Sequence, residues 1–251
     1  DVATPDEEFS VAQYQLLATE KIEEIWQWGK LPILVGGAGF YIKAIVDGIE
    51  TIGFPPNEEL REKLQNYTVS ELQKLLEETC LERLQRMNKS DRNNPRRLVR
   101  AIEIAEQIKN EKFKMKNLNS KLQIDNLLMI GLRAPNKILY QRIDQRIDER
   151  VRQGIVKEIR ALLKKGYSWK NSVLAATLGY QEFQPFFEGK ATLEETIQTW
   201  KFSEHNYARR QMTWFQKDKR IHWFDVTEPD FGKKIVNLVR KWYSKNGAHK
   251  S

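Results

Sequence analysis

The chain has 251 residues, of which 40% are hydrophobic, so it is long enough to bury a core as one domain with an insertion. Its 42 lysines and arginines against 34 acidic residues give a net charge of +8, which favours a polyanionic partner such as nucleic acid over an acidic one. The single cysteine excludes an internal disulfide, the three histidines lack zinc-site spacing, and no apolar run is long enough for a membrane span. The acidic start of the chain does not resemble a signal peptide, and we expect a cytoplasmic protein with no membrane partner.

The first predicted elements are a helix and a strand. Ser10 and Gln13 form a capping box for a helix from residue 11 to about residue 28, and Gly29 ends it. The apolar, partly β-branched run Ile33–Val35 then predicts a short strand that is covered on both faces.

A glycine-rich turn follows this strand. Gly36, Gly37 and Gly39 remove side chains where the backbone must approach a substrate, and a helix from Phe40 to Val46 would direct its positive end toward the same place. An ordinary tight turn between a strand and a helix is the alternative, since such glycines alone are a weak signal.

The rest of the chain predicts an interrupted α/β core. A break at Gly53–Pro56 precedes a stretch to about residue 114 in which every apolar repeat is helical. Strands separated by long helical stretches indicate a parallel sheet, with residues 1–50 and 115–251 as the α/β core and residues 51–114 as an inserted helical arm. The elements expected after residue 114 are a strand at 127–132, a charged helix at 136–165, a loop at 166–171, further helices to about 217 and a last strand at 221–224.

The first basic block lies at the start of a predicted helix, which Asn94 caps and Pro95 begins. Four apolar residues at helical spacing form its packing stripe, and three arginines lie away from that stripe. Three guanidinium groups beside a positive helix end are unfavourable unless an anion neutralises them, so phosphate contact is favoured over a solvated face. The stripe is Leu98, Ala101, Ile102 and Ala105, and the arginines are Arg96, Arg97 and Arg100.

A second basic block follows residue 136, where Arg142, Arg146 and Arg150 recur every four residues. Asp144 and Asp148 recur at the same spacing, so a surface ladder of ion pairs explains the pattern at least as well as a ligand does. The functional alternative for Arg142 and Arg146 is a diphosphate, because the planar guanidinium matches phosphate oxygens.

A third pair of blocks combines aromatic and basic residues, at 178–182 and at 209–215. Exposed rings beside arginines are typical of single-stranded nucleic acid binding, because bases stack on rings while cations hold the backbone. Trp200, Trp214 and Trp223 could instead belong to the core.

Taken together, these blocks resemble the tRNA dimethylallyltransferase family over nearly the whole chain. The resemblance rests on several independent motifs that occur in the family's order. These are Pro5-Asp-Glu-Glu-Phe-Ser10, the Pro-Ile-Leu-Val-Gly-Gly-x-Gly-Phe-Tyr run ending at Tyr41, Asn94-Pro-Arg-Arg-Leu-Val-Arg-Ala-Ile-Glu103, Arg142-Ile-Asp-x-Arg146, Leu178-Gly-Tyr180 and Arg210-Gln-x-Thr-Trp-Phe215.

The resemblance implies a P-loop NTPase-like core with a helical arm, and transfer of a dimethylallyl group from dimethylallyl diphosphate to the exocyclic amine of the adenosine 3′ to the tRNA anticodon. It also implies Mg²⁺ as cofactor, a flipped adenosine and a tRNA anticodon stem-loop as partner, and we expect a monomer. The implied reaction-channel residues are Gly36, Gly37, Ala38 and Gly39, and the implied diphosphate residues are Arg142 and Arg146. The implied tRNA contacts are Arg96, Arg97, Leu98, Val99, Arg100, Ala176, Thr177, Leu178, Gly179, Tyr180, Gln181, Arg209, Arg210, Gln211, Met212, Thr213, Trp214, Phe215 and Gln216.

The sequence departs from the family pattern in three ways. The motif G-x-x-x-x-G-K-[ST] and the aspartate that serves as general base are absent from these residues, so we expect the 251-residue chain by itself to be an inactive portion of a transferase. Ala38 stands where the family has threonine, and Ala176 stands where an arginine or a glutamine is common. The alternatives are a non-catalytic tRNA-binding module and a nucleotide-kinase-like P-loop enzyme.

Overall fold

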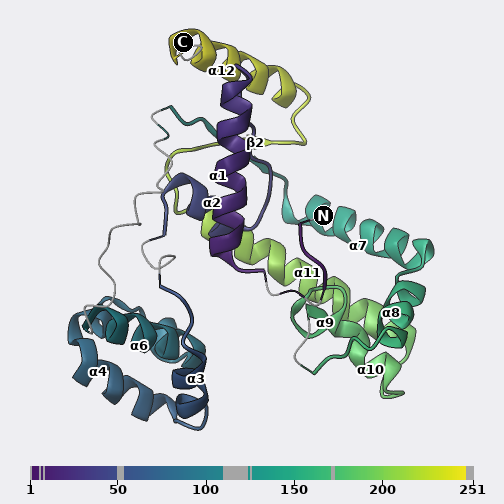
Figure 1. Ribbon diagram of the computed structural model, residues 1–251. Helices are drawn as coiled ribbons and strands as arrows, with labels where there is room; N and C mark the ends of the chain where they lie inside the picture. Colours follow the sequence, from purple (N-terminus) through teal and green to yellow (C-terminus); the bar gives the residue numbers. More distant parts are fainter. Residues whose placement is uncertain are drawn as a thin grey trace. The chain divides into compact units, whose positions relative to one another are not determined.

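The computed structural model describes residues 2–5, 7, 9–49, 54–109, 124, 126–170 and 173–246 (Figure 1). The chain divides into two compact units, which we call the core unit (Asp1–Ile42 and Ile124–Ser251) and the helical unit (Lys43–Gln123). Residues 110–114, expected to be helical, and parts of the block at 5–10 and of the loop at 166–171 lie outside the described residues.

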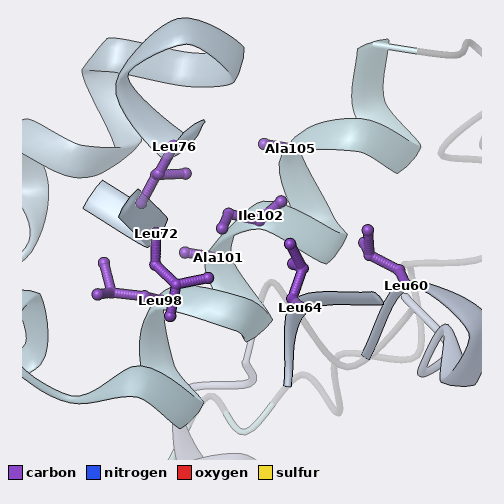
Figure 2. Close-up of a cluster of buried hydrophobic side chains, with 8 residues drawn as sticks. All are labelled: Leu60, Leu64, Leu72, Leu76, Leu98, Ala101, Ile102 and Ala105. Carbon is purple, nitrogen blue, oxygen red and sulfur yellow. The ribbon is translucent and has the colours of Figure 1, made fainter. Parts of the chain in front are cut away.

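The helical unit has one apolar core, built mainly between α4 and α6 (Figure 2). All four residues of the predicted stripe on α6 are buried in it. Asn94 accepts a hydrogen bond from the backbone N–H of Arg97 at 3.3 Å, which confirms the predicted cap before Pro95. The helices that lie wholly within the described part of this unit are α3 (Glu58–Leu64), α4 (Val69–Arg86), α5 (Lys89–Arg92) and α6 (Pro95–Lys109).

The core unit begins with the predicted helix α1 (Val11–Gln27), whose capping box between Ser10 and Gln13 is present as expected. The predicted helix after the glycine turn is also present, as α2 (Gly39–Val46), and the ring of Tyr14 on α1 stacks on Tyr41 at 4.6 Å between centroids. The remaining elements are β1 (Met129–Arg133), α7 (Asn136–Gln153), α8 (Ile155–Lys164), α9 (Val173–Ala176), η1 (Gln181–Phe183), α10 (Gln184–Phe187), α11 (Leu193–Phe215), β2 (Ile221–Asp225) and α12 (Phe231–Asn246).

Strands β1 and β2 pair in parallel, with Gly131 opposite Trp223. A Cβ atom on Gly131 would lie 2.6 Å from the Trp223 ring, so a residue without a side chain is needed there. The long helical connection between the two strands is the crossover that parallel pairing requires. The α/β fold class is thereby confirmed.

The prediction of a strand at Ile33–Val35 is wrong. Residues 31–35 form no strand, and Ile33 and Val35 are 78% and 87% exposed. A strand exists only through hydrogen bonds to a neighbour, and within the described residues the sheet contains β1 and β2 alone. The apolar run therefore remains an extended, exposed segment.

Two further expectations about helices are corrected. The charged helix predicted over 136–165 is two helices, because Gly154 adopts a left-handed conformation with φ of +103° and ends α7 before α8 begins. Helix α12 was not among the predicted elements. Among the described helices, none combines the length and the apolarity needed to cross a bilayer.

The core unit has its own apolar cluster where α7 and α8 meet η1 and α11. Trp200 of α11 is 1% exposed and packs edge-on against Phe183 at 5.8 Å between ring centroids. Trp200 is therefore a core residue and not an exposed ring that could stack on a base. The other buried members of the cluster are Ile143, Ile147, Ile155 and Ile159.

Candidate functional site

The glycine turn lies directly against α11, 174 residues further along the chain. The side-chain amide of Gln211 donates a hydrogen bond to the carbonyl oxygen of Gly37 at 2.8 Å. Added Cβ atoms on Gly37 and Gly39 would lie 2.3 Å from Gln211 Nε2 and 2.3 Å from the Trp214 ring. Two blocks that the sequence presented separately are thus one surface of the core unit.

This contact explains two of the three glycines of the turn. The turn glycines are absent from the set of glycines with positive φ, so a left-handed backbone is not their reason. Gly37 and Gly39 are needed because α11 approaches so closely, whereas nothing lies within 4 Å of a Cβ atom on Gly36. Ala38, between them, is exposed, and its carbonyl oxygen accepts the backbone N–H groups of Tyr41 and Ile42 at the start of α2.

An open hollow of about 330 Å³ lies along α11 beside this contact. Trp214 is 45% exposed and forms part of its wall, so one indole both covers Gly39 and faces the hollow. Three of the side chains that line the hollow are cationic, which makes it electropositive. The lining residues are Asn206, Arg209, Arg210, Thr213, Trp214 and Lys217.

Sequence reasoning missed Asn206 and Lys217 as members of this surface. They extend the face of Arg210 and Thr213 by one helical turn in each direction, with spacings of four, three and four residues. That spacing was the available signal. Of the other predicted residues of this block, Met212 and Phe215 are half-buried, and Gln216 is exposed at the end of α11.

The predicted block at 176–181 forms a turn that packs on the core of the same unit. Gly179 has φ of +87°, and its N–H donates to the buried carboxylate of Glu182 at 2.8 Å. The Tyr180 hydroxyl donates to Glu158 at 2.5 Å, and burial followed by this hydrogen bond raises the pKa of Tyr180 above its usual 10.0. The polar end of the Tyr180 ring is therefore already engaged within the protein. Of the other members, Ala176 is exposed, Leu178 is half-buried, and the Thr177 carbonyl accepts the N–H of Tyr180.

Asp144 and Asp148 of α7 pair with α11 rather than along their own helix. Asp144 contacts His205 at 2.8 Å and Asp148 contacts Lys201 at 2.7 Å. Arg146 contacts Glu204 of α11 at 3.4 Å, while Arg142 is exposed and has no carboxylate within 4.0 Å among the described residues. The ladder of ion pairs therefore joins α7 to α11. Of the two arginines proposed for a diphosphate, Arg146 already contacts a carboxylate and Arg142 does not.

The three arginines of α6 in the helical unit also differ. The fully buried carboxylate of Glu103 accepts from Arg100 at 2.9 Å and from Arg61 at 2.6 Å. Arg100 donates in addition to the carbonyl of Phe54 at 2.6 Å, so its guanidinium serves the interior of this unit.

The other two arginines of this block remain on the surface. Arg97 pairs with Asp91 and keeps 60% of its side chain exposed, and Arg96 is exposed. The buried stripe residue Leu98 and the half-buried Val99 have little surface to offer a partner. Arg96 and Arg97 are therefore the members of the block that a phosphate can reach.

The described residues hold no group of three or more histidine, cysteine or acidic side chains arranged as metal ligands. The donor set therefore does not fit a metal cage made by these residues. Magnesium commonly uses one or two carboxylates together with substrate phosphates, and no particular carboxylate of the described residues is identified as its ligand.

Known structures with this architecture are tRNA isopentenyltransferases. The enzyme from Bacillus halodurans superimposes with a TM-score of 0.66 at 33% identity, covering 98% of this chain and 77% of that one. The Staphylococcus epidermidis enzyme gives 0.62 at 26% identity, over 96% of this chain and 79% of that one. A eukaryotic dimethylallyltransferase acting on tRNA shares the fold, with a TM-score of 0.73, at 22% identity over 98% of this chain and 64% of that one. The fold is thus the P-loop NTPase-like fold of that class.

Sequence comparison gives the family. A family model described as IPP transferase matches residues 1–218, and the chain belongs to this family. The tRNA dimethylallyltransferase of Halalkalibacterium halodurans is 36% identical over 249 residues, which are 95% of this chain and 76% of the relative. That of Thermoanaerobacter pseudethanolicus is 37% identical over 238 residues, 91% of this chain and 73% of the relative. The resemblance drawn from the motifs is confirmed, and the nucleotide-kinase alternative is set aside.

Proposed function

We propose that this protein takes part in transfer of a dimethylallyl group from dimethylallyl diphosphate to the N6 amine of the adenosine 3′ to a tRNA anticodon. The observation that carries the proposal is the contact of the glycine turn with α11, which joins the candidate channel to a basic, aromatic surface. The reaction forms a bond from the adenosine nitrogen to the allylic carbon, breaks the bond from that carbon to the diphosphate oxygen, and releases one proton from the amine.

The hollow on α11 is the proposed contact for the anticodon loop. An exposed indole among arginine and lysine side chains suits an unpaired base and its backbone, because the base stacks on the ring while the cations hold the phosphates. In this proposal Arg209 and Arg210 hold phosphates and Trp214 stacks on a base. The turn at 176–181 contributes its exposed edge, since the Tyr180 hydroxyl is bound to Glu158.

The helical unit is proposed to be the inserted tRNA-binding arm, with the stem as its partner. Arg96 and Arg97 are its phosphate contacts. They lie in the first turn of α6, at the N-terminal end, where the helix dipole also favours an anion. Arg100 supports this surface from within, through the buried Glu103.

The leaving diphosphate is proposed to lie near α7. Arg142 is the better candidate contact, since it is exposed and has no carboxylate within 4.0 Å in the described structure, whereas Arg146 must share its charge with Glu204. Mg²⁺ would supply further charge neutralisation for the diphosphate, but no cluster of metal ligands is present among the described residues. We propose a cytoplasmic site of action and a monomer.

The test measures transfer and binding with matched RNAs. The protein produced from its own gene is incubated with labelled dimethylallyl diphosphate and an unmodified anticodon stem-loop. The control stem-loop carries guanosine in place of the target adenosine and so lacks the N6 amine. Label in the adenosine RNA alone supports the proposal. Binding of both RNAs without any label transfer would instead leave the protein as a tRNA-binding module.

A further inference from the structure

The amide side chain of Gln211 faces into the protein, although it lies on the helix proposed to contact RNA. Gln211 is half-buried, and its Nε2 donates to the Gly37 carbonyl at 2.8 Å. Turning the whole amide outward to RNA would break this hydrogen bond. The side chain is therefore committed to the glycine turn.

The contact is specific to this side of α11. Gln211 and Trp214 are three residues apart, so they lie on one face, where they meet Gly37 and Gly39 respectively. The positions next to them, Arg210 and Thr213, line the basic hollow. One helix thus presents one face to the turn and the adjoining face to solvent.

We propose that Gln211 is a positioning residue, which fixes the glycine turn relative to the RNA-binding face of α11 and does not itself bind RNA. The inference rests on the proposed function, in which this turn receives the target adenosine. A displacement of a reacting group by even 1 Å can lower a rate about a hundredfold, so one hydrogen bond that fixes the turn has a kinetic effect without touching substrate. The group that Gln211 holds is the Gly37 carbonyl oxygen.

The test replaces Gln211 by methionine, which has similar length and no N–H donor. Hydrogen exchange is followed in the peptide that covers residues 31–41, together with stem-loop affinity and the single-turnover rate of prenyl transfer. Loss of one hydrogen bond of typical strength should loosen the turn and speed exchange of the Tyr41 amide, which donates to the Ala38 carbonyl, about fivefold. The transfer rate should fall by roughly three- to tenfold, while the dissociation constant of the RNA stays within about twofold.

The matched control is Gln198→Met, on the same helix. Its exposed amide donates to Glu194 at 2.9 Å and does not touch the turn, so exchange at 31–41 should not change. A second variant, Gly37→Ala, places a methyl group where the Gln211 amide lies and should displace it. Gln211→Met should then add little further effect in the Gly37→Ala background.

The outcomes separate this inference from the proposed function. Failure of the protein produced from its own gene to transfer label contradicts the proposed function, while the exchange measurement still decides the role of Gln211. Unchanged exchange of the Tyr41 amide in Gln211→Met overturns the inference. A more than tenfold loss of RNA affinity with an unchanged rate also overturns it, because Gln211 would then be an RNA contact.

Discussion

At the scale of single residues, Trp214 has the most demanding position in the site. Its ring leaves no room for a side chain on Gly39, and 45% of the residue is nevertheless exposed toward the basic hollow. A large apolar ring remains exposed beside arginines when it has a partner to stack on, and an unpaired base has the matching shape. Trp200 of the same helix is buried in the core, which shows that aromatic content alone does not separate the two roles.

We predict that Trp214→Ala weakens binding of the anticodon stem-loop about tenfold or more, since stacking on an aromatic side chain contributes about 1–3 kcal/mol per base. Trp214→Phe should lose less, because a smaller ring is retained. Trp28→Ala is the control, as Trp28 is 57% exposed at the end of α1 and belongs to no proposed contact. Fluorescence anisotropy with labelled stem-loop measures all three. Equal affinities for Trp214→Ala and the unmodified protein would contradict the stacking role.

At the scale of helices and strands, the capping boxes show how local sequence determines element boundaries. Thr68 and Glu71 form such a box at the start of α4, and hydrogen bonds from the Thr68 side chain and backbone lower the pKa of Glu71 below its usual 4.5. A lowered folded-state pKa means that the carboxylate stabilises the protein above pH 4.5 and that this contribution is lost as the pH falls through the folded value.

We predict that Glu71→Gln keeps the box and removes its titration. Gln13 already serves the same position in the box of α1, where its side chain accepts the Ser10 N–H at 2.7 Å. The urea midpoint should therefore fall less between pH 7 and pH 3.5 in Glu71→Gln than in the unmodified protein, at about the same starting stability. Glu71→Ala should be less stable at pH 7. An identical pH dependence in Glu71→Gln would contradict the assignment.

The buried carboxylate of Glu103 gives a second prediction at this scale. Arg100→Ala leaves that carboxylate short of a charged partner, and breaking a buried pair in this way costs about 3–5 kcal/mol. Arg61 also contacts Glu103 at 2.6 Å, so we expect the lower end of this range. Arg96→Ala, on the exposed surface of the same helix, is the control and should leave thermal unfolding unchanged. Equal unfolding curves for the two variants would contradict the structural role of Arg100.

At the scale of the whole molecule, the sequence predicted what is local or patterned and missed what depends on distant partners. The capping box at Ser10, the cap at Asn94 and the strands around Gly131 and Trp223 follow from neighbouring residues and were predicted. The run at Ile33–Val35 has strand composition, but composition does not supply a hydrogen-bonding neighbour.

The candidate site shows the same limit. Its blocks were identified from their residues and their order, while the bond from Gln211 to Gly37 spans 174 positions and no local pattern encodes it. The positive charge of the arginines also did not show which of them are available to a phosphate. Arg97 and Arg100 belong to the same basic block, and only the folded helical unit shows that the carboxylate beside Arg100 is buried.

The net charge of +8 has a consequence for the whole molecule, because phosphate contacts release counterions. We predict that replacing Arg96 and Arg97 together by glutamine weakens stem-loop binding and lowers the slope of log affinity against log salt by about two units, one for each lost phosphate contact. The control pair is Lys21 and Arg86, two exposed cations outside the proposed contacts, whose replacement by glutamine should leave the slope unchanged. An unchanged slope in the Arg96 and Arg97 variant would make these arginines an ordinary solvated face.

Participation of this protein in prenylation of the adenosine next to a tRNA anticodon can be tested in the cell. The gene is disrupted in its own organism, and the nucleosides of purified tRNA are measured by mass spectrometry with and without a restored intact gene. We predict that N6-dimethylallyladenosine and its derivatives disappear from position 3′ to the anticodon on disruption and return with the intact gene. Full retention of the modification in the disrupted strain would contradict the account.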